Sequence, residues 1–145
     1  MSSTIVTCPN CGKKNRVASA QEGVPHCGNC HNALPWIVDS DARSFDQDIA
    51  STLPVLVDFW APWCGPCRMV SPVVERIGTE LAGRLKVVKL NVDEAPEISA
   101  RYQVQGIPLL VLHRDGSEVD RLVGAVGEPQ LRAWLDRHLA AAAGV

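Results

Sequence analysis

Residues 55–67 read Val-Leu-Val-Asp-Phe-Trp-Ala-Pro-Trp-Cys-Gly-Pro-Cys, an apolar run that leads directly into a Cys-x-x-Cys pair. The run predicts a buried strand over 55–60, and Pro66 suits the first turn of a helix that begins near Cys64. Two thiols three positions apart at a helix start can form a disulfide, and the unpaired helix N–H groups favour a thiolate on the first. The stretch therefore predicts thiol-disulfide exchange, with Cys64 as nucleophile and the more deeply buried Cys67 as resolving thiol.

Outward from this stretch, expected strands and helices alternate. The helix after Cys64 should continue to Leu81, with a kink at Pro72. A turn at Asp115-Gly116 predicts a hairpin. Leu131, Trp134, Leu135 and Leu139 have the spacing of a core-facing helix stripe. This order predicts an α/β fold, a mixed central sheet with helices on both faces. The expected strands are 37–38, 55–60, 86–92, 107–112 and 117–123, and the expected helices are 44–51 (with Ser44 as its cap), 64–81, 95–102 and 128–140.

The first 35 residues contain four further cysteines, Cys8, Cys11, Cys27 and Cys30, in the spacing C-x2-C-x15-C-x2-C. This spacing is typical of a site in which four thiolates hold Zn²⁺. His26 and His31 flank the second pair and offer alternative ligands, although the symmetric cysteine spacing favours four sulfurs. The segment has few large aliphatic side chains, so we expect the metal to supply much of its stability. The sequence also permits these cysteines to form disulfides instead, under oxidation.

The bulk properties exclude several classes of partner. The chain has 145 residues, a net charge of −2 and 46% hydrophobic residues, as in a soluble globular protein. This charge gives no reason to expect nucleic acid or an acidic membrane surface as partner. No apolar run is long enough for a membrane span, and the N-terminal residues show no signal sequence. We therefore expect a cytoplasmic protein, where six cysteines indicate metal binding and catalysis.

The decapeptide from Asp58 to Cys67, with Gly106-Ile107-Pro108 downstream, resembles thioredoxin over about Trp36 to His138. With the four N-terminal cysteines, the chain is similar to the zinc-binding thioredoxin 2 type of bacteria. The resemblance implies the thioredoxin fold. We accordingly expect a small zinc-ribbon-like module in residues 1–35 and a thioredoxin domain in residues 36–145.

The resemblance also assigns roles within the site. Asp58, a carboxylate among apolar neighbours, becomes the buried acid that takes and returns the Cys67 proton, rather than a solvent-facing strand end. Lys89 matches a lysine near this acid, although a surface lysine on a strand is common. Pro108 matches a cis-proline opposite the disulfide. Leu109 stands where threonine is usual, so the resemblance does not extend to fine substrate preference. The expected flat docking surface comprises Trp63, Gly65, Pro66, Ile107, Val123 and Gly124, with Trp60 divided between this surface and the core.

The function implied is that of a protein-disulfide reductase, which acts as a monomer on protein disulfides. A flavoprotein thioredoxin reductase that uses NADPH would recharge it, as the resemblance implies. Two other interpretations remain: an adaptor whose zinc module binds another macromolecule, and a sensor whose zinc cysteines oxidise and release metal. The intact Cys64–Cys67 pair and the small basic excess of residues 1–35 argue against the adaptor.

Overall fold

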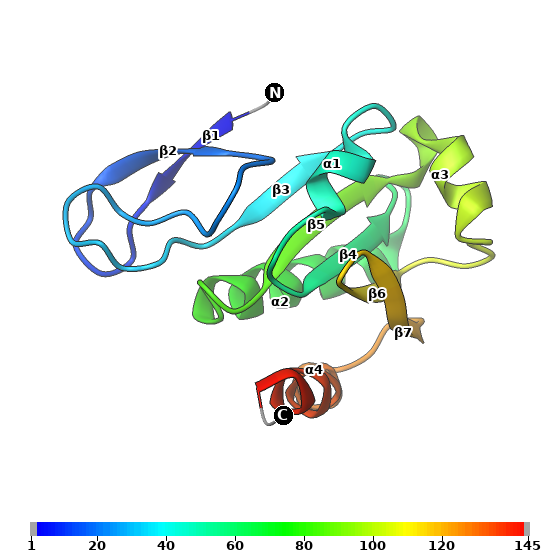
Figure 1. The fold of residues 1–145 in the computed structure, drawn as a ribbon. Coiled ribbons are helices and arrows are strands. Elements are labelled where there is room, and N and C mark those ends of the chain that lie inside the picture. Colours follow the sequence, from blue (N-terminus) through cyan, green and yellow to red (C-terminus); the bar gives the residue numbers. More distant parts are fainter. Residues whose placement is uncertain (1–2, 144–145) are drawn as a thin grey trace.

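The computed structural model of the protein describes residues 3–143, with side chains through Leu139, and has a five-stranded sheet at its centre (Figure 1). The strands are β3 (Ile37–Ser40), β4 (Val55–Trp60), β5 (Lys86–Asn91), β6 (Leu109–Arg114) and β7 (Ser117–Val123). Their order is β3-β5-β4-β6-β7. β5 pairs in parallel with β3 and β4, whereas β6 pairs antiparallel with β4 and β7. The predicted mixed sheet is therefore confirmed, with β4 in the middle.

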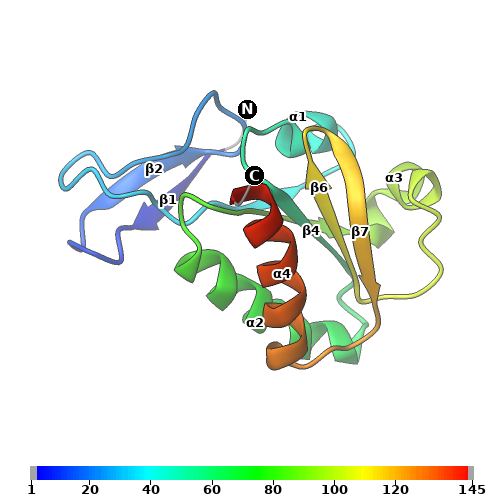
Figure 2. The ribbon, with the colours of Figure 1, turned by 60° about the horizontal axis from the view of Figure 1, so that its bottom comes forward.

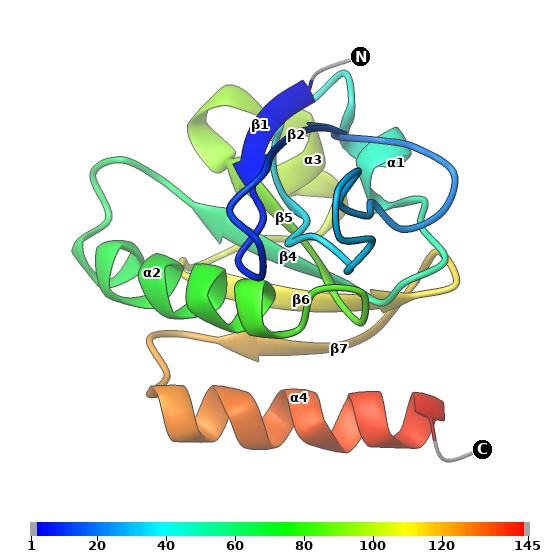
Figure 3. The same ribbon diagram turned by 90° about the vertical axis from the view of Figure 1, so that its left-hand side faces the viewer.

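Helices cover both faces of this sheet, as predicted. α2 (Gly65–Glu80) and α4 (Glu128–Ala143) lie side by side on one face (Figures 2 and 3). α1 (Phe45–Ile49) and α3 (Pro96–Arg101) pack on the other face, and a short 3-10 turn, η1 (Val92–Glu94), precedes α3. The stripe expected on the last helix is buried against the first face: Leu131, Trp134, Leu135 and Leu139.

Several element boundaries differ from the predicted ones. β6 begins at Leu109 rather than at residue 107, because Pro108 has no N–H to donate to a strand ladder. The strand continues to Arg114, where Asp115 and Gly116 turn the chain with φ angles of 54° and 80°. α1 ends at Ile49, and the Ser44 hydroxyl donates to Asp48 over 2.8 Å instead of capping the backbone. α4 extends past residue 140 to Ala143.

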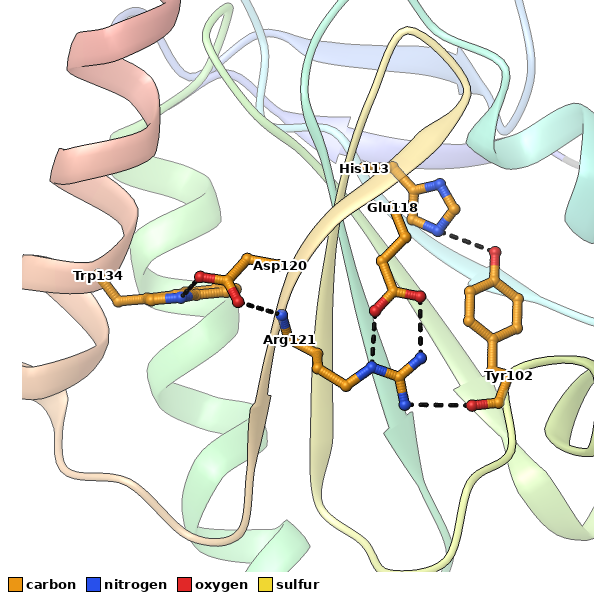
Figure 4. A network of polar contacts seen from close by, with 6 residues as sticks. All are labelled: Tyr102, His113, Glu118, Asp120, Arg121 and Trp134. Atoms are coloured by element: carbon orange, nitrogen blue, oxygen red, sulfur yellow. Dashed lines mark hydrogen bonds and ion pairs between the residues drawn. The ribbon is translucent and has the colours of Figure 1, made fainter.

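A network of polar contacts fixes β7 to its neighbours (Figure 4). Asp120 accepts a hydrogen bond from the Trp134 indole of α4 at 2.8 Å. Arg121 pairs with Glu118 and donates to the Tyr102 carbonyl at 3.1 Å. The Tyr102 hydroxyl in turn lies 2.8 Å from Nε2 of the buried His113. These contacts tie β7 to α4 on one side and to the end of α3 on the other.

The N-terminal residues form a hairpin that the sequence did not predict. β1 (Ser3–Thr7) pairs antiparallel with β2 (Lys14–Ala18). The hairpin and the two loops that carry the cysteines lie beside β3 at one end of the sheet (Figure 1). Backbone hydrogen bonds close each cysteine loop, from Gly12 to Cys8 at 2.9 Å and from His31 to Cys27 at 2.9 Å.

This module shares its small apolar core with the rest of the chain. Val17 and Leu34 pack with Trp36 and Val38, which belong to the sheet domain. The Trp36 indole donates to the Ala18 carbonyl at 3.0 Å. Lys86, at the start of β5, donates to the Ser19 carbonyl at 2.7 Å and lies 4.0 Å from the centroid of the Trp36 ring. The segment therefore does not rely on its own few aliphatic residues alone.

Candidate functional site

The two cysteines of the Cys-x-x-Cys pair lie where β4 has ended and α2 begins. Cys64 occupies the N-cap position, and Pro66 lies in the first turn, where its missing N–H leaves no helical bond unmade. Cys64 and Cys67 are joined as a disulfide with a Cα–Cα distance of 5.3 Å. The backbone N–H of Cys67 donates to the Cys64 sulfur over 3.2 Å. A negative charge on that sulfur would therefore face a helix N–H group.

The two cysteines are buried to the same degree in this oxidised state. Their exposed fractions are 3% and 2%, so the expected contrast, with Cys67 more deeply buried, is absent. The reason is that the disulfide holds both sulfurs in one apolar cluster. Its other members are Ala61, Trp60, Val92 and Ile107.

Asp58 lies in the middle of β4 and is fully buried. Its Oδ2 accepts a hydrogen bond from the Ser71 hydroxyl at 2.9 Å, whereas its Oδ1 has no hydrogen-bond partner among the described residues. Burial raises the pKa of Asp58 to about 6, although the Ser71 hydrogen bond and the charge of Lys89 both lower it. The carboxyl group thus titrates close to neutral pH, where a proton acceptor is most useful.

Lys89 lies on β5 directly opposite Asp58, as its Cα partner across the parallel pair. Its ammonium is 3.5 Å from Glu75 of α2 and 5.7 Å from the centroid of the Trp60 ring. The side chain is 16% exposed, so Lys89 is largely buried rather than an ordinary surface lysine. Its charge lowers the pKa of Asp58, whereas that of Glu75 raises it.

Pro108 follows a cis peptide bond after Ile107 and is buried. Its carbonyl accepts a hydrogen bond from the Gly124 N–H at 2.9 Å, which brings the end of β7 beside it. Ile107 contacts the cluster of the disulfide. Leu109, where threonine was expected by resemblance, is 2% exposed and packs among the core residues behind this segment.

Three of the residues expected on the docking surface, Trp63, Ile107 and Val123, line two neighbouring depressions. Trp63 and Ile107 line a groove with Val92 and Pro96. Val123 instead lines a second, smaller depression. Trp63 and Val123 are 68% and 66% exposed, so both present apolar surface to solvent. Gly65 and Pro66 are exposed beside the disulfide.

Two residues near the disulfide were not predicted from the sequence, although the position of each in the sequence indicates that it lies close to the site. Asp93 accepts a hydrogen bond from the Trp63 indole at 2.9 Å. It follows the end of β5, which runs parallel to β4, so both segments leave the sheet at the same edge. Ser71 contacts Asp58 and follows Cys67 by four positions, which places the two on the same face of α2.

The four N-terminal cysteines form a second cluster, remote in sequence from the disulfide. Their sulfur atoms all lie within 4.8 Å of one another. The Cys8–Cys30 and Cys11–Cys27 sulfur pairs are each 3.6 Å apart, and none of the four is in a disulfide. Four sulfurs around a tetrahedral Zn²⁺ at about 2.3 Å would be about 3.8 Å apart. The donor set and spacing thus fit a zinc ion, and both histidines are exposed and outside the cluster.

Hydrogen-bond donors lie around this cluster and favour a charged sulfur on Cys27 and Cys30, whereas burial and the neighbouring cysteine sulfurs raise the pKa of Cys8. The backbone N–H of Cys30, together with that of Asn29 and the side chain of Asn15, lowers the pKa of Cys27 to about 6. The Asn15 amide lies 3.5 Å from the Cys27 sulfur. The Asn29 amide similarly reaches the Cys11 sulfur at 3.5 Å. Donors of this kind orient thiolate ligands and stabilise their charge.

Comparisons with known proteins agree with the fold. The family model described as Thioredoxin matches residues 36–137. Thioredoxin 1 of Synechococcus elongatus is 49% identical over 100 residues, 69% of this chain and 94% of that protein. Thioredoxin 1 of Nostoc sp. is 50% identical over 109 residues, 74% of this chain and 99% of that protein.

A third relative extends into the N-terminal module. Thioredoxin C-3 of Corynebacterium nephridii is 38% identical over 139 residues, 93% of this chain and 95% of that protein. Between residues 3 and 143, no helix has the length and apolar character needed to cross a bilayer. The family match over most of the sheet domain, together with a disulfide at the start of α2, establishes that this chain belongs to the thioredoxin family of thiol-disulfide oxidoreductases.

Proposed function

We propose that the protein reduces disulfides in other proteins through Cys64 and Cys67. The observation that carries this proposal is the disulfide at the N-terminus of α2, with the buried Asp58 on the adjacent strand. Helix N–H groups at this position favour a thiolate on Cys64, which is the form of cysteine that attacks disulfides. The Gly-Pro between the cysteines resembles that of reducing thioredoxins.

The reaction proceeds in two exchange steps. The Cys64 thiolate attacks one sulfur of the substrate disulfide, and the other substrate sulfur leaves and takes up a proton. Cys67 then loses its proton and attacks the Cys64 sulfur. The bond between Cys64 and the substrate breaks, and the second substrate sulfur leaves as a thiol. The dithiol of this protein is thereby oxidised to the disulfide, and the substrate gains two electrons and two protons.

Asp58 is the proposed acceptor of the Cys67 proton. It is a buried carboxylate whose pKa of about 6 leaves it mostly ionised at neutral pH. A pocket of about 160 Å³ is lined by Cys67, by Lys89 and by the Ser71 that contacts Asp58, and is large enough to hold water beside Cys67. Lys89 is proposed to support the charged form of Asp58, and Pro108 to shape the surface on which the substrate backbone lies.

Substrate docking is proposed on the apolar surface around the disulfide. Trp63, Ile107 and Val123 provide exposed or half-buried apolar contacts, with Gly65, Pro66 and Gly124 beside them. A surface of this kind selects by shape and apolar area rather than by charge. By family resemblance, a flavoprotein thioredoxin reductase that uses NADPH returns the disulfide to the dithiol. The four cysteines outside disulfides favour a reducing compartment, for which we propose the cytoplasm.

The N-terminal module is proposed to hold one Zn²⁺ through Cys8, Cys11, Cys27 and Cys30, as in the zinc-binding thioredoxin 2 type. The support is the close approach of four sulfurs, together with the amide donors around them. A four-thiolate site is closed to substrate, so the ion would stabilise the two loops rather than take part in exchange. Such binding links the metal to the folding of the module.

Replacement of the resolving thiol tests the order of the two exchange steps. Cys67→Ser should accumulate a mixed disulfide between Cys64 and a substrate, because attack is retained and resolution is lost. Cys64→Ser is the matched control and should form no such adduct. Non-reducing gels and mass spectrometry after reaction with insulin would measure the adduct. Equal trapping by the two variants would show that the roles are assigned wrongly.

Asp58→Asn should stabilise the protein at pH 7 while slowing disulfide exchange. Burial raises the Asp58 pKa from its ordinary 3.8 to about 6, so the native state binds more protons than the unfolded chain between these values. Stability of the wild type therefore falls as pH rises through that window, and above it the buried charge costs about 3 kcal/mol.

The asparagine variant removes this charge, so its free energy of unfolding should exceed that of the wild type by roughly 1–3 kcal/mol at pH 7, and the Asp58 contribution to the pH dependence between pH 4 and 6 should be absent. Denaturant melts at several pH values, with insulin reduction rates alongside, measure both effects. A variant that is less stable than the wild type, with unchanged turnover, would make Asp58 an ordinary structural residue.

The metal content of the reduced protein tests the N-terminal site. We expect one zinc per chain in freshly purified protein, and its loss in Cys27→Ser, because three sulfurs leave the tetrahedral site open. A variant with both His26→Ala and His31→Ala is the control and should retain the metal. Chelation should disorder the module while the sheet domain keeps its own core. Zinc-free wild type, or loss of zinc only in the histidine variant, would refute the four-cysteine assignment.

A further inference from the structure

The Ser71 hydroxyl is the one polar group in hydrogen-bond contact with the buried Asp58 carboxyl among the described residues. It donates to Oδ2 at 2.9 Å, and Oδ1 is left without a partner. Ser71 is partly buried on the inner face of α2, four positions after Cys67. Both residues lie within α2, so a spacing of four places Ser71 and Cys67 on the same face of the helix.

Ser71 also connects Asp58 to the cysteine. The pocket near the disulfide is lined by Cys67 and Ser71 but not by Asp58 itself. Its remaining wall comprises Trp60, Ala61, Pro62, Arg68 and Lys89. Ser71 therefore contacts both the carboxyl group and the pocket that Cys67 lines.

The other charged groups around Asp58 are further away and partly oppose each other. On β5, Lys89 favours the ionised carboxylate, whereas Glu75 on α2 disfavours it, and these two form an ion pair of 3.5 Å. On β6, the residue opposite Asp58 is the apolar Leu110. Arg68, also on α2, is exposed and donates to the Pro62 carbonyl. A direct hydrogen bond from Ser71 is therefore the contact that can hold one oxygen of the carboxylate in a fixed position.

We propose that Ser71 is a positioning residue for the exchange reaction: its hydroxyl holds Oδ2 of Asp58, leaves Oδ1 as the oxygen that accepts the proton, and sets the pH range in which Asp58 deprotonates Cys67. The proposal rests on the proposed role of Asp58. The proton passes from the Cys67 sulfur to the Asp58 carboxylate, and the thiolate so formed attacks the Cys64 sulfur of the mixed disulfide. Ser71 keeps its own proton throughout.

The hydrogen bond is made to the charged form of the carboxyl group, so its loss should favour the protonated form. A hydrogen bond to a charged group is strong enough to shift a titration midpoint by about one pH unit. In Ser71→Ala, the acid limb of the pH profile for insulin reduction should therefore move upward by about one unit. The rate should fall about fivefold at pH 6 and remain nearly unchanged at pH 8.

The test compares pH profiles of insulin reduction by the pre-reduced full-length protein with a direct ¹³C NMR titration of the Asp58 carboxyl. Ser71→Thr keeps the hydroxyl and should restore both midpoints. Thr79→Ala is the matched control, because Thr79 carries an exposed hydroxyl on the same helix that donates to the Glu75 carbonyl. It should change neither midpoint. In an Asp58→Asn background, Ser71→Ala should have no further effect on the rate at any pH.

The outcomes separate this proposal from the one it rests on. If Asp58→Asn abolishes the acid limb but Ser71→Ala leaves both midpoints at their wild-type positions, Asp58 acts without help from Ser71 and only the present proposal fails. A uniform loss of rate at all pH values in Ser71→Ala would likewise overturn it, because that is the signature of a structural defect. If Asp58→Asn keeps the wild-type profile, Asp58 is not the proton acceptor and both proposals fail.

Discussion

The junction between β4 and α2 imposes the constraint on which the rest of the site depends. Cys64 must lie at the N-cap of α2, where its sulfur accepts from the Cys67 N–H, and α2 must start close to the sheet edge. β4 satisfies this because it is the central strand, paired on both sides and buried along its length. The Cys64 sulfur thus follows directly on a strand that is buried and paired on both sides, although it lies in a turn itself.

Two buried residues of the sheet, Asp58 and Lys86, have side chains that can carry a charge. Asp58 lies on β4, and its Oδ1 has no hydrogen-bond partner in the part of the chain that the structure describes. Lys86 lies at the start of β5 and donates to the Ser19 carbonyl. Burial lowers the pKa of Lys86 to about 8 and raises that of Asp58 to about 6. Lys86 binds the N-terminal module to the sheet, whereas Asp58 serves the proposed chemistry. Burial of each charge lowers the stability of the fold relative to an apolar residue at the same position.

Much of the fold was predictable because the patterns were strong and local. The apolar run at 55–60, the Asp115-Gly116 turn and the stripe from Leu131 to Leu139 all correspond to observed elements. The features that the sequence did not predict depend on contacts between residues that are distant in the chain. The β1–β2 hairpin shows little alternation of apolar and polar residues in the sequence. It packs against Trp36, whose indole donates to the Ala18 carbonyl. The equal burial of Cys64 and Cys67 follows from the disulfide and its apolar neighbours, which no local pattern indicates.

The central claim is that the helix start makes Cys64, and not Cys67, the reactive thiol. The most direct measurement is the rate at which iodoacetamide alkylates each cysteine of the reduced protein as a function of pH, resolved by peptide mass spectrometry. The account predicts that Cys64 reacts first and keeps its reactivity at lower pH than a free thiol such as glutathione, because the thiolate is favoured there. Equal rates for Cys64 and Cys67, both with the pH dependence of glutathione, would contradict it.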